Sequence, residues 1–193
     1  MCGIAGYIGN IGVKESIIKK TLKLMSNRGP DNQSFKAIQQ KGKNIYLLHS
    51  RLSIIDLDVR SSQPYEDSDI TLVFNGEIYN YIEIRNKLKK LGYLFKTNSD
   101  TEVLIKSYQE YGEKCVDHFE GMWSFALYDK NTKKLFLSRD RFGEKPLFYL
   151  KTGNGYFFGS EVKFVESLIQ KKLDVDLDKL KEFIVLGHKA VYK

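Results

Sequence analysis

The sequence is poor in the residues that build cross-linked or metal-bound proteins. Its 193 residues include two cysteines, Cys2 and Cys115, and three histidines. The two cysteines form neither a disulfide framework nor a spacing suited to metal ligation. So few thiols and imidazoles also disfavour a zinc cluster. We therefore expect a protein without metal, from a reducing compartment, the cytoplasm.

The sequence also lacks a long hydrophobic run. No apolar stretch approaches the roughly 20 residues that span a bilayer, and the N-terminus has no signal-peptide core. We expect no membrane partner. The net charge is +7, from 31 basic and 24 acidic residues. The lysines are scattered and not clustered with aromatic residues, so we expect no nucleic-acid partner either.

Hydrophobic spacing predicts a single domain with antiparallel sheets covered by helices, an α+β fold. Predicted helices cover 13–26, 81–91, 99–112, 160–169 and 176–186. Predicted strands cover 3–8, 44–49, 71–75, 122–129, 134–138, 147–151 and 156–158. Ser99 and Glu102 predict a capping box at the start of the third helix. Helices before, between and after the hairpins disfavour a doubly wound parallel sheet.

A cysteine directly after the initiator methionine suggests a nucleophile with its own base. A small second residue permits removal of Met1, which leaves Cys2 with a free α-amine beside its thiol. An α-amino group has a reference pKa near 8, so it is partly neutral at working pH and can accept the thiol proton. The alternative is that Cys2 is a small apolar residue at the start of a strand. Its position alone favours that alternative, and the polar residues elsewhere argue against it.

Three other segments supply what hydrolysis of an amide requires. Asn75 and Gly76 can donate a side-chain amide and a backbone N–H to a developing oxyanion, although Asn-Gly is also a tight-turn pair. Arg51 can bind a carboxylate through two hydrogen bonds, or form a surface salt bridge. Asp100, at a predicted helix start where an anion is stable in any case, can bind an ammonium. Free glutamine presents one carboxylate, one ammonium and one amide, which match Arg51, Asp100 and the group around Cys2.

Five motifs together resemble class II glutamine amidotransferases, and within them the glutaminase half of asparagine synthetases. They are MCGIAG at 1–6, RGPD at 28–31, RLSIIDL at 51–57, NGEIYN at 75–80 and DRFGEKPL at 140–147. The resemblance extends over nearly the whole chain. It implies the N-terminal nucleophile hydrolase fold, a four-layer αββα sandwich of two stacked antiparallel sheets.

The resemblance also implies a role for each site residue. Cys2 would be the nucleophile, with Asn75 and Gly76 as the oxyanion hole. The residues expected to hold glutamine are Arg51, Leu52, Ile54, Glu77 and Asp100. Those expected to brace the floor of the site are Arg28 and Asp31, for which a purely structural role is equally open. The residues interpreted as structural are Cys115, His49 and His188.

The resemblance also implies that ATP is used in a different domain from the one that hydrolyses glutamine. Asparagine synthetases carry a second, ATP-using domain with a glycine- and serine-rich loop, and residues 1–193 contain neither that loop nor a P-loop pattern. We expect one glutaminase domain without a cofactor, with ATP and magnesium used only in a separate synthetase domain or subunit that accepts the ammonia. The chain would be either an excised domain or a stand-alone subunit. Two alternatives stay open: a hydrolase of another amide, and a degenerate module kept for binding or regulation.

Overall fold

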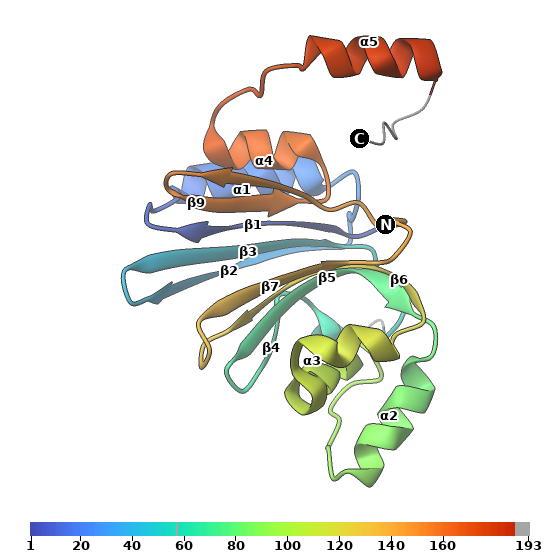
Figure 1. Cartoon of the computed structure of the whole chain (residues 1–193). Coiled ribbons are helices and arrows are strands. Elements are labelled where there is room, and N and C mark those ends of the chain that lie inside the picture. Colours follow the sequence, from blue (N-terminus) through green and yellow to red (C-terminus); the bar gives the residue numbers. More distant parts are fainter. Residues whose placement is uncertain (57, 188–193) are drawn as a thin grey trace.

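The computed structural model describes residues 1–56 and 58–187, so the last residue of the 51–57 motif and His188 lie outside the described residues. Within them, two antiparallel sheets stack face to face (Figure 1). The first has the strand order β2-β3-β1-β9-β8 and the second β4-β5-β6-β7. The strands are β1 Gly3–Gly9, β2 Asn32–Gln40, β3 Lys43–Arg51, β4 Tyr65–Asp67, β5 Ile70–Ile78, β6 Gly121–Asp129, β7 Lys134–Arg139, β8 Phe148–Thr152 and β9 Gly155–Gly159.

Helices cover the outer faces of both sheets (Figure 1). Helices α1 and α4 pack on the first sheet, and α2 and α3 on the second. Their bounds are α1 Glu15–Met25, α2 Tyr81–Lys90, α3 Asp100–Tyr111 and α4 Val162–Ile169, followed by α5 Leu177–Leu186, which buries none of its residues. The order helix, sheet, sheet, helix confirms the predicted four-layer sandwich.

Strand β1 shows why these residues form the centre of the first sheet. It pairs with β3 on one side and β9 on the other, and its residues alternate between two cores. Ala5 and Tyr7 pack against the helix layer, whereas Ile4 packs against the second sheet. A side chain at Gly6 would collide with the carbonyl of Tyr46 and the ring of Phe158, so only glycine fits there. Close packing on both faces fixes the strand that begins directly after Cys2.

Strand β5 of the second sheet also has side chains that alternate between two cores. Val73 faces the first sheet, and Phe74 faces the helical layer. Because side chains alternate along a strand, Asn75 points back into the space between the sheets. The strand continues to Ile78, so Asn75 and Gly76 lie inside a strand and the tight-turn alternative is wrong.

The structure corrects two further expectations. Strands β2 and β4 were not predicted, because β2 (NQSFKAIQQ) is mostly polar and β4 is three residues long. The predicted capping box is also wrong. The hydroxyl of Ser99 accepts from the backbone N–H of Thr101. The Glu102 carboxylate instead accepts from the N–H groups of Lys96 and Thr97, because the segment before the helix turns back over it.

Candidate active site

Cys2 lies at the entrance to β1, where the backbone holds it from two sides. Gly3 pairs with Ser50 of β3, which brings Cys2 beside the end of that strand. The Cys2 sulfur is 3.4 Å from the N–H of Leu52. On the other side, Arg28 Nε donates to the Cys2 carbonyl at 2.9 Å, and Arg28 is held in turn by Glu161 at 3.2 Å. Arg28 thus lies behind the cysteine and fixes its main chain.

The Cys2 thiol has no side-chain base in the described part of the chain. Its hydrogen bonds are to the backbone of Leu52. Burial raises the pKa of the thiol above its ordinary value, against the lowering effect of the Leu52 backbone. The α-amine belongs to Met1 as long as that residue is present. Met1 lines a cavity next to Cys2, with its sulfur 3.4 Å from the Lys145 ammonium. In an unprocessed chain, burial therefore disfavours the thiolate, and Cys2 has no α-amine of its own to take the proton.

One edge of β5 supplies hydrogen-bond donors next to this thiol. Strand β4 pairs only with residues 70–72 of β5, so beyond Leu72 that edge has no strand neighbour among residues 1–56 and 58–187. The N–H of Phe74 donates to the side chain of Gln63 at 2.6 Å, and the N–H of Ile78 donates to Asp100 at 3.1 Å. Backbone N–H groups alternate sides along a strand, so the N–H of Gly76 points toward the same open edge.

The Asn75 side chain adds a second donor. Its amide nitrogen is buried and has no hydrogen-bond partner among the residues that the structure describes. A buried donor without a partner costs about 1–3 kcal/mol, which a ligand oxygen would relieve. Asn75 and Gly76 line the cavity that also contains Cys2. The two donors can therefore stabilise negative charge that develops beside the sulfur.

Asp100 places a buried carboxylate at the wall of the cavity. It is the first residue of α3 and is 4% exposed. Burial raises its pKa to about 6, although hydrogen bonds from the backbone of Ile78 and Thr101 act in the opposite direction. The charge of Glu77 also raises it. Such a carboxylate is costly when ionised and alone, and a cationic ligand would offset that cost.

Arg51 ends β3 and is 6% exposed. Its guanidinium donates to the carbonyls of Asp56 and Asp58 and to the Ser62 hydroxyl. No carboxylate in 1–56 or 58–187 forms an ion pair with it, so the surface salt-bridge alternative is wrong. Arg51 holds the segment after β3 around itself and keeps its positive charge beside the cavity.

These groups share one small cavity of about 80 Å³. Eight of the residues singled out from the sequence line it: Cys2, Arg51, Leu52, Ile54, Asn75, Gly76, Glu77 and Asp100. Arg28 and Asp31 do not line it. Asp31 accepts from the N–H of Ser53 at 2.7 Å and so fixes the segment that carries Leu52 and Ile54.

Sequence reasoning missed several residues of this cavity, among them Ser61, Gln63 and Lys145. Lys145 lies within the motif at 140–147, which could have indicated it, whereas Gln63 belongs to no motif. Two of the residues interpreted as structural, Cys115 and His49, are buried. Cys115 lies in the helix-side core, and burial raises its pKa to about 12. Burial lowers the pKa of His49 to about 3.

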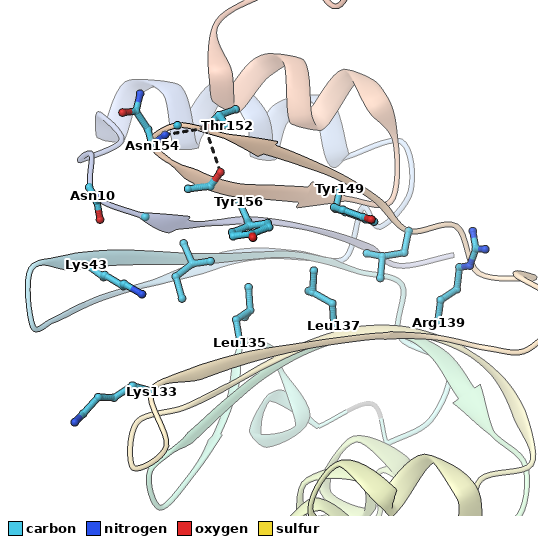
Figure 2. A pocket seen from close by; sticks show the side chains of 15 residues that line it. Asn10, Lys43, Lys133, Leu135, Leu137, Arg139, Tyr149, Thr152, Asn154 and Tyr156 are labelled. Carbon is cyan, nitrogen blue, oxygen red and sulfur yellow. Dashed lines mark hydrogen bonds between the residues drawn. The ribbon is translucent and has the colours of Figure 1, made fainter. Parts of the chain in front are cut away.

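A larger cavity, about 910 Å³, lies between the edge strands β7 and β8, as Figure 2 shows. Leu135 and Leu137 face Tyr149 and Tyr156 across it, with Arg139 at one end. Its lining contains no cysteine, histidine, aspartate or glutamate. Its lysines and tyrosines are not joined by a thiol, an imidazole or a carboxylate. The smaller cavity brings a thiol next to oxyanion donors and is therefore the candidate active site.

Comparison with known proteins agrees with this fold and site. The family model described as a glutamine amidotransferase domain matches residues 1–192. The B. subtilis glutamine phosphoribosylpyrophosphate amidotransferase superimposes with a TM-score of 0.68 at 18% identity, over 88% of this chain and 44% of that one. The structural likeness supports the fold alone. The chain belongs to the class II glutamine amidotransferase family.

Within the family, the chain is homologous to part of the glutamine-hydrolysing asparagine synthetases. The putative asparagine synthetase 2 of Methanocaldococcus jannaschii is 38% identical, over 97% of this chain and 39% of the relative. Asparagine synthetase 3 of Bacillus subtilis is 36% identical, over 97% of this chain and 31% of the relative. Asparagine synthetase 2 of the same bacterium is 43% identical, over 84% and 22%. The chain thus spans well under half the length of these relatives.

None of the helices described is both long and apolar enough to cross a membrane. Within the same residues, no group of three or more histidine, cysteine, aspartate or glutamate side chains is arranged to hold a metal ion.

Proposed function

We propose that this domain hydrolyses L-glutamine to glutamate and ammonia through a thioester on Cys2. The observation that carries the proposal is the cavity that joins the cysteine to two oxyanion donors, the Gly76 N–H and the Asn75 side-chain amide, whose nitrogen has no partner among the described residues. The same cavity has a guanidinium at Arg51 and carboxylates at Glu77 and Asp100. These charges complement the α-carboxylate and α-ammonium of a free amino acid.

The chemistry follows from these positions once Met1 has been removed. The Cys2 α-amine takes the thiol proton, and the sulfur attacks the carbon of the side-chain amide. The carbonyl oxygen becomes an oxyanion that accepts hydrogen bonds from Asn75 and Gly76. The α-ammonium returns the proton to the amide nitrogen, the C–N bond breaks, and ammonia leaves. The same amine then deprotonates a water molecule, which attacks the thioester. The C–S bond breaks, glutamate is released, and the ammonium returns the proton to the sulfur.

We further propose that the ammonia serves an asparagine synthetase-type amidation of a carboxylate. The similarity to glutamine-hydrolysing asparagine synthetases supports this destination. The acceptor would be activated with ATP and magnesium by a separate synthetase domain or subunit, and the glutaminase domain itself would need no cofactor. The residues of the site oppose both alternatives: a degenerate module needs no nucleophile, and an uncharged amide does not need Arg51 and Asp100.

The test compares processed and unprocessed protein. A cleavable N-terminal fusion that leaves Cys2 as the first residue should release glutamate from glutamine, and the same chain with Met1 retained should not. Cys2→Ala should abolish activity and keep the fold, because little buried volume is lost, whereas Cys115→Ser is the matched control. Intact-mass analysis establishes the N-terminus of each sample. Full activity from a uniformly Met1-bearing sample would refute the mechanism.

A further inference from the structure

Beyond Leu72, side chains form the hydrogen bonds to the backbone of β5 that a neighbouring strand would otherwise form. Phe74, the residue before Asn75, has both of its backbone groups occupied in this way. Its N–H donates to Gln63 Oε1 at 2.6 Å. Its carbonyl lies 3.2 Å from His49 Nε2. The carbonyl can only accept a hydrogen bond, so His49 donates through Nε2.

His49 reaches this carbonyl from the other sheet. It lies on β3 and pairs with Ile4 of β1, the strand that begins directly after Cys2. Apolar residues fill the rest of the contact between the sheets in this region, among them Ile4 and Val73. Such packing is strong but non-directional. The bond from His49 is directional, and it connects the strand framework of the nucleophile to the strand of the oxyanion donors.

The His49 imidazole is neutral, which suits a hydrogen-bond donor and does not suit an acid–base catalyst. The His49 side chain is 0% exposed, and burial lowers its pKa to about 3. The ring is therefore neutral at any working pH. With the hydrogen on Nε2, Nδ1 is an acceptor, and it has no partner among the residues that the structure describes. A leucine would fill this position but would leave the Phe74 carbonyl without its donor, so the hydrogen bond to Phe74 distinguishes histidine here.

Gln63 also binds the helix α3, which carries Asp100. Its Nε2 lies 3.3 Å from the Thr101 hydroxyl, in the first turn of α3. Asp100 precedes Thr101 and accepts from the N–H of Ile78 on the same edge of β5. Gln63 therefore couples the oxyanion strand to the helix that carries the buried carboxylate.

We infer that His49 and Gln63 are positioning residues, which fix the free edge of β5 so that Asn75 and Gly76 stay aligned with the Cys2 sulfur. The inference rests on the glutaminase function proposed above. Neither residue touches the reacting atoms in this role, and both act through Phe74. A loss of alignment affects the transition state more than substrate binding, because the oxyanion forms only during the reaction.

The test separates alignment from stability. His49→Phe keeps a ring in the core and removes the donor, Gln63→Met removes the amide from the loop, and His49→Gln restores a terminal N–H donor. The matched control is Tyr128→Phe. It removes another hydrogen bond between the sheets, the one from the Tyr128 hydroxyl to Gln40 at 2.6 Å. Neither residue lines the Cys2 cavity, and Tyr128 pairs with Thr71, at the other end of β5 from Gly76.

We expect His49→Phe and Gln63→Met to lower kcat by about 10- to 100-fold, with KM changed by less than about threefold. His49→Gln should recover most of the lost kcat. Tyr128→Phe should leave kcat unchanged even where it lowers the melting temperature as much. If folded His49→Phe and Gln63→Met both retain the wild-type kcat, the inference is wrong.

Hydrogen exchange provides a second readout that needs no enzymatic activity. Amides of residues 73–78 should exchange faster in His49→Phe and Gln63→Met than in the wild type or in Tyr128→Phe. Unchanged exchange there overturns the positioning role. A wild-type protein that hydrolyses no glutamine would instead refute the proposed function, and the exchange rates would then decide by themselves whether His49 and Gln63 hold β5.

Discussion

Replacing Asp100 with asparagine should stabilise the ligand-free protein at neutral pH while it weakens glutamine hydrolysis. Asp100 is buried, and its pKa is raised from 3.8 to about 6 by that burial. The folded state therefore binds the proton more tightly than the unfolded state does. Between about pH 4 and pH 6 the folded protein carries more protons, so its stability falls as pH rises through this window.

The size of the effect follows from the shift. A difference of about 2 pKa units corresponds to about 3 kcal/mol, the full cost of holding Asp100 ionised above pH 6. Asparagine avoids this cost. Its side-chain oxygen can still accept from the N–H of Ile78, and its amide can donate to the Ser99 hydroxyl, which lies 3.4 Å from the present carboxylate.

Urea unfolding at a series of pH values measures the cost. The free energy of unfolding of Asp100→Asn minus that of the wild type should grow by about 2–3 kcal/mol from pH 4 to pH 7. Asp178→Asn on the exposed face of α5 is the control and should give a flat difference. A difference for Asp100→Asn that stays constant within about 0.5 kcal/mol would contradict the raised pKa.

Activity should change in the opposite direction. Asparagine cannot neutralise the α-ammonium of glutamine, so the KM of the variant should rise. In the wild type, kcat/KM should fall as pH drops through about 6, because protonated Asp100 loses its charge. Wild-type kcat/KM in Asp100→Asn would show that the carboxylate is structural.

Three further outcomes are expected. Arg51→Ala should raise KM and also lower kcat, because the side chain both faces the cavity and holds the carbonyls of Asp56 and Asp58; steady-state kinetics that equal the wild type would exclude a role in binding. The electrophilic glutamine analogue diazo-oxo-norleucine should add to Cys2 and spare the buried Cys115, and peptide mapping that finds the label on Cys115 would contradict the assignment of the nucleophile. Residues 1–193, incubated with ATP, magnesium, aspartate and ammonium, should form neither AMP nor asparagine; ATP turnover traceable to this chain would reveal a nucleotide site within it.

Local signals account for the parts of the fold that were predicted. The helices at 81–91 and 99–112 have apolar residues at helical spacing, and they appear as α2 and α3 with ends shifted by a residue at most. Strands with apolar runs were found for the same reason. The polar strand β2 has no such pattern. It forms because β3 offers it nine paired positions, and that partner lies outside any local sequence window.

The candidate site divides in the same way. Its residue types and order along the chain were legible from the sequence, since a cysteine at position 2, an Asn-Gly pair, an arginine and an aspartate each suit one part of glutamine. Whether they meet depends on pairing between distant segments, such as Gly3 with Ser50, and on the hydrogen bond between Asp100 and Ile78. The structure places eight of them around one cavity.

The sequence by itself determined the five α-helices and seven of the nine strands that the structure describes, the α+β class, and the nucleophile, oxyanion and charged groups of the site, because these follow from local periodicity and residue chemistry. Only the tertiary structure decided that the pairing of β5 with β4 ends at Leu72, and that the side chains of His49 and Gln63 bind the edge of β5 beyond it. The physical reason is that a backbone N–H or carbonyl is free or bound according to its neighbours in space, and those neighbours come from other parts of the chain.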